Sequence, residues 1–235
     1  MNTVDSILEE LKSLGSASTK KTFLRHGARE PYFGVKIGDL KVIEKRLKKD
    51  YALSLALYET GNSDAMYLAG LIADEKAMTE SDLEHWLEGA YWYMLSEYTV
   101  AWVAAESTHG YKLATKWIAD KRERYAAAGW ATLAGRLALG KMDDFKKGEL
   151  EALLDQVLKT LHQSPNRARY TMNSFLIALG TYVPDLRNKA IGIANGLGEV
   201  RVDVGDTACQ VPVAADYIVK ASERWNGKYR KQVRC

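Results

Sequence analysis

Cysteine, proline and long apolar runs are all scarce in this chain of 235 residues. Its two cysteines, Cys209 and Cys235, are too few for a disulfide framework, so we expect both to be reduced thiols. Four prolines leave most of the sequence free to form helices. No apolar run approaches the roughly 18 residues of a membrane helix, and the acidic N-terminus lacks a signal-peptide pattern. These absences argue against a disulfide-rich or membrane-spanning protein, and we expect a cytoplasmic location.

Motifs for metals and nucleotide cofactors are missing as well. The histidines are scattered, without a cysteine or acid at ligand spacing. The segment "GVKIGDL" lacks the Lys-Ser/Thr pair of a phosphate-binding loop, and no G-x-G-x-x-G follows a strand pattern. The sequence therefore predicts no metal site and no cofactor.

Helix-favouring residues, above all Ala, Leu, Lys and Glu, dominate the composition and predict an all-α fold. Helical apolar spacing recurs about every 15 to 20 residues between short breakers. The predicted helices lie in "GDLKVIEKRLKKD", at 51–58 and 64–73, in "TESDLEHWLEGAY" after a Thr79 cap, and at about 93–105, 109–119, 123–139, 149–162, 166–181, 185–195 and 213–225.

One segment departs from this pattern. Residues 196–212 combine recurring glycine with alternating valine, which predicts a short hairpin or an ordered loop. No linker is long enough to divide the chain, so we expect one domain over residues 1–235. Helix pairs joined by short turns fit either a compact bundle or an α-solenoid, a superhelix of HEAT-like repeats.

Charge is distributed in blocks. Residues 20–49 carry a net +7, residues 50–106 a net −10, residues 107–147 a net +5 and residues 159–235 a net +6. Within the first block, Lys41, Lys45 and Lys48 form a cationic helix stripe beside an apolar face. This distribution suits a protein that binds a polyanion through selected segments, although a solvated surface with blocky charge is the alternative.

The C-terminal tail, residues 224–235, is basic and aromatic together. Lys228, Arg230 and Lys231 are interleaved with Trp225 and Tyr229. This pattern suits phosphate contact plus stacking on bases, and a disordered charged tail is the equal alternative.

Four segments resemble one known family in order, spacing and character: "YFGVKIGDLKVIEKRLKK", "LYETGNSDAMYLAGLIADEKAMTESDLEHWLE", "YWYMLSEYTVAWVAAES" and "KWIADKRERYAAAGW". The family is the AlkD-like DNA alkylation repair family, and the resemblance covers roughly residues 30 to 180. It implies HEAT-like repeats around a concave basic groove that binds double-stranded DNA. Active members are monofunctional glycosylases that hydrolyse the N-glycosidic bond of purines alkylated at N3 or N7.

The resemblance also implies site residues. The family places Trp and Asp four positions apart on one helix, and the matching positions here are Tyr93 and Glu97. Tyr93 would face the cationic base and Glu97 would stabilise the positive charge that develops on the sugar. A further family aromatic falls near Phe175, and Arg124 is the nearest candidate for the family's arginine.

An aromatic stripe in this helix has a plainer explanation. Tyr91, Leu95, Tyr98, Trp102 and Ala105 follow helical spacing, and such a stripe is more often core than site. Glu97 lies off the stripe, on a face that is either groove or ordinary surface.

Three functions stay open at this stage. The chain is a monomeric alkylpurine-DNA glycosylase that uses Glu97 and Tyr93, a non-catalytic relative that binds DNA structures, or a helical repeat that binds a protein. In the first two cases Lys41, Lys45, Lys48, Phe175, Arg124, Lys228, Arg230 and Lys231 are the expected nucleic-acid-binding residues.

Overall fold

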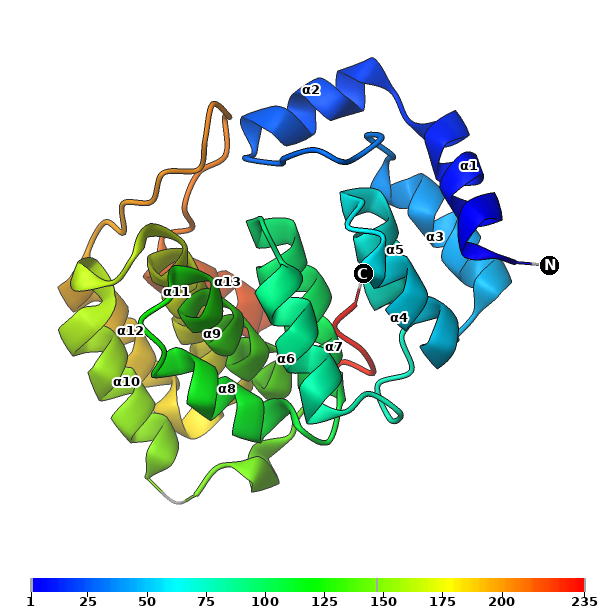
Figure 1. The fold of residues 1–235 in the computed structure, drawn as a ribbon. Coiled ribbons are helices and arrows are strands. Elements are labelled where there is room, and N and C mark those ends of the chain that lie inside the picture. The colour runs from blue at the N-terminus through cyan, green and yellow to red at the C-terminus, as the bar shows by residue number, and fades with distance from the viewer. Residues whose placement is uncertain (1, 147, 235) are drawn as a thin grey trace.

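The computed structural model describes residues 2–146 and 148–234, and the regular secondary structure in those ranges is all helical, with no strand. Within these described ranges, thirteen α-helices follow one another around a curved path, as in a HEAT-like superhelix (Figure 1). Their bounds are α1 Val4–Leu14, α2 Ala17–Arg25, α3 Ile37–Leu47, α4 Tyr51–Glu59, α5 Ser63–Ile72, α6 Glu80–Gly89, α7 Ala101–Glu106, α8 Gly110–Ile118, α9 Glu123–Ala138, α10 Glu149–Thr160, α11 Asn166–Tyr182, α12 Arg187–Leu197 and α13 Ala214–Arg224. The all-α prediction and the superhelix are confirmed.

Local capping explains why several helices begin where the sequence predicts. Thr79 Oγ1 accepts a hydrogen bond from Asp82 N at 3.1 Å, and Asp82 Oδ2 accepts one from Thr79 N at 2.8 Å, so α6 starts with a capping box. Asp50 Oδ1 caps α4 by accepting from Leu53 N at 3.0 Å. Short polar side chains thus satisfy amide groups that a helix start leaves unpaired.

The segment predicted as one helix at 93–105 is two elements. Met94–Val100 form a π-helix, η1, which continues into α7. A π-helix has wider turns than an α-helix, so the side chains of the predicted stripe, residues 91 to 105, do not all point into the core. Leu95 and Ala105 are buried, whereas Tyr98 is only half-buried. Tyr98 packs against the core, as the stripe predicts, and it also lines the cavity described below.

A loop near the N-terminus explains the "YFGV" motif. Asp64, at the start of α5, accepts hydrogen bonds from the backbone N–H groups of Phe33, Gly34 and Val35 at 2.5, 3.0 and 3.0 Å. Gly34 has φ +79°, and a Cβ there would lie 2.7 Å from the backbone nitrogen of Lys20. Only glycine fits this turn without strain.

Residues 198–213, after α12, form an ordered loop that we name the bridging loop. Asn166 fixes it by donating to Asp203 O at 2.8 Å and accepting from Asp203 N at 2.7 Å. At Gly205 the loop reaches α2, where an added Cβ would lie 2.2 Å from Arg25 O. The bridging loop therefore joins the two ends of the curved chain path (Figure 1).

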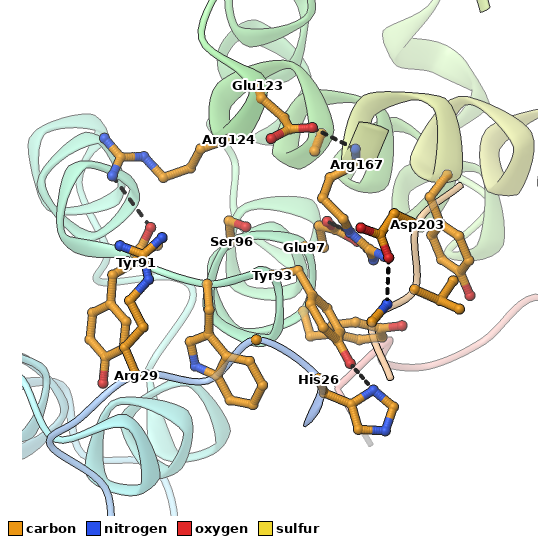
Figure 2. Close-up of a pocket in the computed structure, with 18 of the residues that line it drawn as sticks. His26, Arg29, Tyr91, Tyr93, Ser96, Glu97, Glu123, Arg124, Arg167 and Asp203 are labelled. Carbon is orange, nitrogen blue, oxygen red and sulfur yellow. Dashed lines mark hydrogen bonds and ion pairs between the residues drawn. The ribbon is translucent and has the colours of Figure 1, made fainter. Parts of the chain in front are cut away.

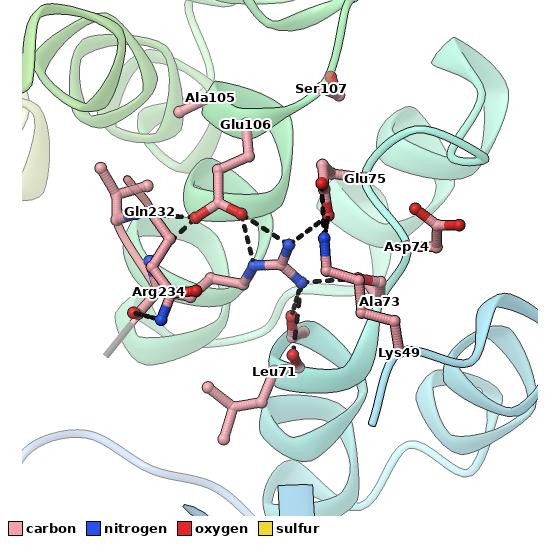
Figure 3. A network of polar contacts seen from close by, with 12 residues as sticks. Lys49, Leu71, Ala73, Asp74, Glu75, Ala105, Glu106, Ser107, Gln232 and Arg234 are labelled. Atoms are coloured by element: carbon pink, nitrogen blue, oxygen red, sulfur yellow. Dashed lines mark hydrogen bonds and ion pairs between the residues drawn. The ribbon is translucent and has the colours of Figure 1, made fainter. Parts of the chain in front are cut away.

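The C-terminal tail is ordered as far as residue 234 and returns to the N-terminal half of the molecule. Arg234 is 6% exposed and forms ion pairs with Glu106 and Glu75, both at 2.6 Å (Figure 3). Its Nη1 also donates to the carbonyls of Gly70 and Ala73 at 3.0 and 2.7 Å. These bonds satisfy carbonyl groups that the end of α5 leaves unpaired. The disordered-tail alternative was therefore wrong, while Cys235 lies outside the described residues.

Candidate nucleic-acid interface

A cavity of about 780 Å³ opens inside the curve of the helices. The segment before η1, η1 itself, the starts of α9 and α11, the end of α2 and the bridging loop all line it (Figure 2). These elements are far apart in the sequence, and the cavity forms because the curvature of the superhelix brings them together. The part of the chain that the structure describes holds no group of three or more His, Cys, Asp or Glu side chains suited to a metal ion. Nor does it contain a helix with the length and apolar character to cross a membrane.

Glu97 and Arg167 form the central contact of the cavity wall. Arg167 Nε donates to Glu97 Oε1 at 2.7 Å, and Arg167 Nη2 donates to Glu97 Oε2 at 2.5 Å. The guanidinium also lies over two rings, 4.2 Å from the centroid of Tyr93 and 4.5 Å from that of Tyr170. A planar guanidinium that is both bidentate and stacked has little freedom to move.

Burial strongly affects the ionisation of this cluster. Burial raises the pKa of Glu97 to about 7, against the opposing effect of Arg167. For Arg167, burial disfavours the charge, but the contact with Glu97 outweighs it and raises the pKa, so the guanidinium stays charged. Burial also raises the pKa of Tyr93 to about 12, which keeps its hydroxyl neutral.

Two further contacts orient the neighbours of this pair. Tyr93 Oη and His26 Nδ1 share a hydrogen bond at 3.1 Å, so the ring is fixed from the end of α2 as well. Glu123 Oε1 accepts from the backbone N–H of Arg167 at 2.7 Å and thereby caps the start of α11. Acid and base groups inside the cavity are thus largely paired with each other.

Unpaired cations lie at the mouth of the cavity. Arg25 and Arg29 are exposed, line the cavity and form no ion pair with another described residue. Arg124, on the opposite wall, donates to Glu88 at 3.0 Å and is about one third exposed. The mouth therefore has positive charge available for an anionic ligand.

Three of the residues predicted for the site come together in the cavity, namely Tyr93, Glu97 and Arg124. Phe175 does not, because it is 0% exposed and packs 5.0 Å from the Trp130 ring in the core. Its predicted role in DNA contact is wrong for that reason: a fully buried ring offers no face to a base.

The predicted lysine stripe and the tail cations lie elsewhere. Lys45 and Lys48 line a separate depression of about 250 Å³ together with Gln232, and no residue of α3 lines the large cavity. Lys228, Arg230 and Lys231 belong to the returning tail, where Arg230 N donates to Ala138 O at 2.9 Å. A role for these cations in binding nucleic acid stays a prediction.

Within the basic block of residues 107–147, the bases between residues 112 and 124 are largely paired with acids of the protein itself. Lys112 pairs with Glu80 and Lys116 with Glu84, each at 2.8 Å, across the faces of α8 and α6. The acidic block of residues 50–106 thus supplies partners to the next basic block. These pairs explain much of the blocky charge without a ligand.

Sequence reasoning missed Arg167, Tyr170 and His26. A signal for the first two was present, because Arg167 and Tyr170 lie at i, i+3 in "RARY" and share one face of the predicted helix at 166–181. Nothing in the sequence pairs that face with Glu97, which lies 70 residues earlier. Their contact follows only from the curvature of the superhelix.

Comparison with known proteins agrees with this architecture. The chain is 35% identical over 232 residues to the uncharacterized protein Lin0241 of Listeria innocua, covering 96% of this chain and all of that protein. It is 34% identical over 230 residues to the uncharacterized protein Lmo0209 of Listeria monocytogenes, covering 95% of this chain and 99% of that one.

A solved structure and a family profile identify the group. The structure is described as "a new family of proteins related to the HEAT-like repeat DNA glycosylases with affinity for branched DNA structures". It matches with a TM-score of 0.89 and 40% identity over 99% of both chains. The sequence profile described as "DNA alkylation repair enzyme" matches residues 7–197, and the chain belongs to this family.

Proposed function

We propose that this protein binds branched DNA through the cavity and its basic mouth, and that it does not cleave the glycosidic bond. The observation that carries the proposal is the contact between Glu97 and Arg167. Both carboxylate oxygens of Glu97 accept from the guanidinium, and the residue is only 5% exposed. A catalytic carboxylate must approach the reacting sugar or its water within hydrogen-bond distance. Glu97 lacks that access while the pair is intact.

Tyr93 supports the same conclusion. The family resemblance assigns it the task of holding a cationic alkylated base on its ring. In this structure the Arg167 guanidinium already covers that ring, 4.2 Å from its centroid. A cationic base on the same face would have to displace the guanidinium, so we infer that alkylpurine is not the ligand at this position.

The electrostatics of the cavity favour DNA as the ligand. Arg25 and Arg29 are free to contact phosphates, because neither forms an ion pair with an acid of the described chain. The starts of α9 and α11 face the same space, and helix starts carry partial positive charge. The relative with affinity for branched DNA matches this chain over nearly its whole length.

Binding to a four-way junction and to a duplex of the same arm sequence, measured across salt concentrations, tests the proposal. We expect tighter binding to the junction and a salt slope that falls by about 0.9 for each phosphate contact removed in Arg25→Ala and Arg29→Ala. Arg201→Ala is the matched control, because Arg201 is 82% exposed and pairs only with its neighbour Glu199. Equal affinity for junction and duplex would contradict the branched-DNA proposal.

Catalysis is tested separately. Methylated genomic DNA incubated with the protein should release methylpurines only at the spontaneous rate. Faster release that disappears in Glu97→Gln would restore Glu97 as a catalytic residue and refute the non-catalytic proposal.

The predicted lysines, the oligomeric state and the location belong to the same proposal. If Lys41, Lys45 and Lys48 contact DNA arms beyond the cavity, their alanine variants will lower the salt slope as well. Light scattering is expected to give a monomer, and a DNA ligand agrees with the predicted cytoplasmic location.

A further inference from the structure

We propose that the cavity binds one unpaired nucleotide at the branch point of the DNA. This inference rests on the proposed function for its DNA context, but the site can be tested with nucleotides alone. The cavity volume of about 780 Å³ is in the range of small-molecule sites, about 300 to 1,000 Å³. A nucleotide fits such a space, whereas a base-paired duplex does not.

Polar groups without partners point into this space. Ser96 is 4% exposed and lines the cavity, and its hydroxyl has no hydrogen-bond partner among residues 2–146 and 148–234. Figure 2 shows it between Arg124 and Glu97, facing the open centre. The hydroxyl itself is accessible from the cavity, so it can donate a hydrogen bond to a ligand atom or accept one from it.

Arg167 offers a second free group. Its Nε and Nη2 donate to Glu97, while the structure gives Nη1 no partner within the described chain. Glu97 is therefore a positioning residue: it holds the guanidinium so that Nη1 is available at the cavity wall. Nη1 can donate to a base or phosphate oxygen.

The walls select the chemical class of the ligand. Tyr91 and Tyr98 line the cavity and are each half-buried. Arg167, which lies over Tyr93 and Tyr170, leaves the first two rings uncovered. Aromatic walls stack on any nucleobase, because every base has a π-face. The phosphate would lie at the mouth beside Arg25 and Arg29. Of the acids in the cavity, Glu97 and Glu123 are engaged in hydrogen bonds, and Asp203 accepts from Gly205 N at 2.9 Å.

A branch point supplies such a nucleotide at low energetic cost. Taking a base out of a duplex requires breaking its pair and its stacking, whereas a base at a junction or flap is already partly or fully unpaired. A site for one unpaired nucleotide therefore gives the protein a physical reason to prefer branched DNA over duplex.

The first experiment uses calorimetric titration of the full chain with dAMP, dTMP, deoxyadenosine and inorganic phosphate. We expect both nucleotides to bind, and the nucleoside and phosphate to bind more weakly because each makes only part of the contacts. Ser96→Leu, which replaces the hydroxyl with a bulky apolar group at the cavity wall, should abolish the heat of binding, and Ser96→Ala should weaken it. Ser222→Ala on α13 is the control, because Ser222 lies outside the cavity. Absence of nucleotide binding by the wild type would overturn the inference.

The second experiment compares a fully paired junction with a junction that carries two unpaired nucleotides at its centre. We expect the wild type to prefer the unpaired junction by about tenfold, the order of one stacked base, and Ser96→Leu to bind both alike. If Ser96→Leu keeps the preference, the inference fails while the branched-DNA proposal stands. If the wild type binds no junction, the proposed function fails, and the nucleotide titration alone decides the cavity's ligand. Should Ser96→Leu not fold by circular dichroism, Ser96→Ala decides in its place, since preference retained in full by that variant overturns the inference.

Discussion

Arg234 is expected to stabilise the fold from the very end of the chain. Its guanidinium joins Glu106 at the end of α7 with Glu75 after α5, and it binds backbone carbonyls of α5 (Figure 3). The contacts span more than 120 residues of sequence. Replacing Arg234 with alanine removes all of them at once and leaves two acids without this cation.

The size of the effect follows from burial and from the remaining partners. Removing one member of a buried ion pair costs about 3–5 kcal/mol, because the other charge stays buried. Glu106 is about as buried as Arg234, with 8% of its side chain exposed. Glu75 retains Lys49, however, and Glu106 still accepts from Val233 N at 2.8 Å. We therefore expect the lower end of the range, about 3 kcal/mol, which lowers Tm by about 6–12 °C for a domain of this size.

Urea unfolding and calorimetry of Arg234→Ala measure this loss. Arg201→Ala removes an equally basic residue from an exposed pair and should change stability by less than about 0.5 kcal/mol. The stability of Arg234→Lys should lie between that of the wild type and that of the alanine variant. The compact ammonium of lysine cannot contact both acids and the backbone carbonyls at once, as the planar guanidinium does. A double-mutant cycle with Glu106→Gln should give a coupling of at least about 1 kcal/mol.

The control decides the outcome. If Arg234→Ala and Arg201→Ala unfold at the same urea concentration, the tail does not stabilise the fold. The reasoning about buried charge would then be refuted, whatever the DNA-binding results.

Three other changes test the loop and the buried acid. Asp64→Asn should cost about 1–3 kcal/mol for each loop amide left unpaired, with the exposed Asp216→Asn as control in urea unfolding. Gly34→Ala should destabilise by about 1–3 kcal/mol because of its positive φ, whereas Gly192→Ala, in an open helical position, should be neutral or stabilising; equal effects would contradict the strain argument. The pKa of Glu97 in the folded protein, about 7, is above its unfolded value of about 4.5. The native state therefore binds more protons than the unfolded state between about pH 4.5 and 7. Relative to Glu97→Gln, the stability of the wild type should fall as the pH rises through this window. Parallel pH curves for the two proteins would refute that pKa.

The positions of the helices could be predicted from the sequence more accurately than the residues of the site. Capping residues such as Thr79 and Asp50, and apolar spacing within each helix, act over a few residues, so they were visible locally. The π-helix η1 could not be predicted from the sequence, because the same residues also satisfy α-helical spacing. Charge was the least reliable guide: the basic cluster in α8 pairs with α6, and that pairing depends on how successive repeats stack.

The candidate site shows what the resemblance leaves out around Glu97. Matching residues to the family pattern assigned Glu97 a sugar and Tyr93 a cationic base, which are both external ligands. The structure provides an internal cation that meets both, since Arg167 pairs with the carboxylate and stacks on the ring. Arg167 comes from α11, a helix that the motif does not include. What a carboxylate contacts thus depends on which cation lies nearest in the folded chain, and a short motif on one helix does not specify that cation.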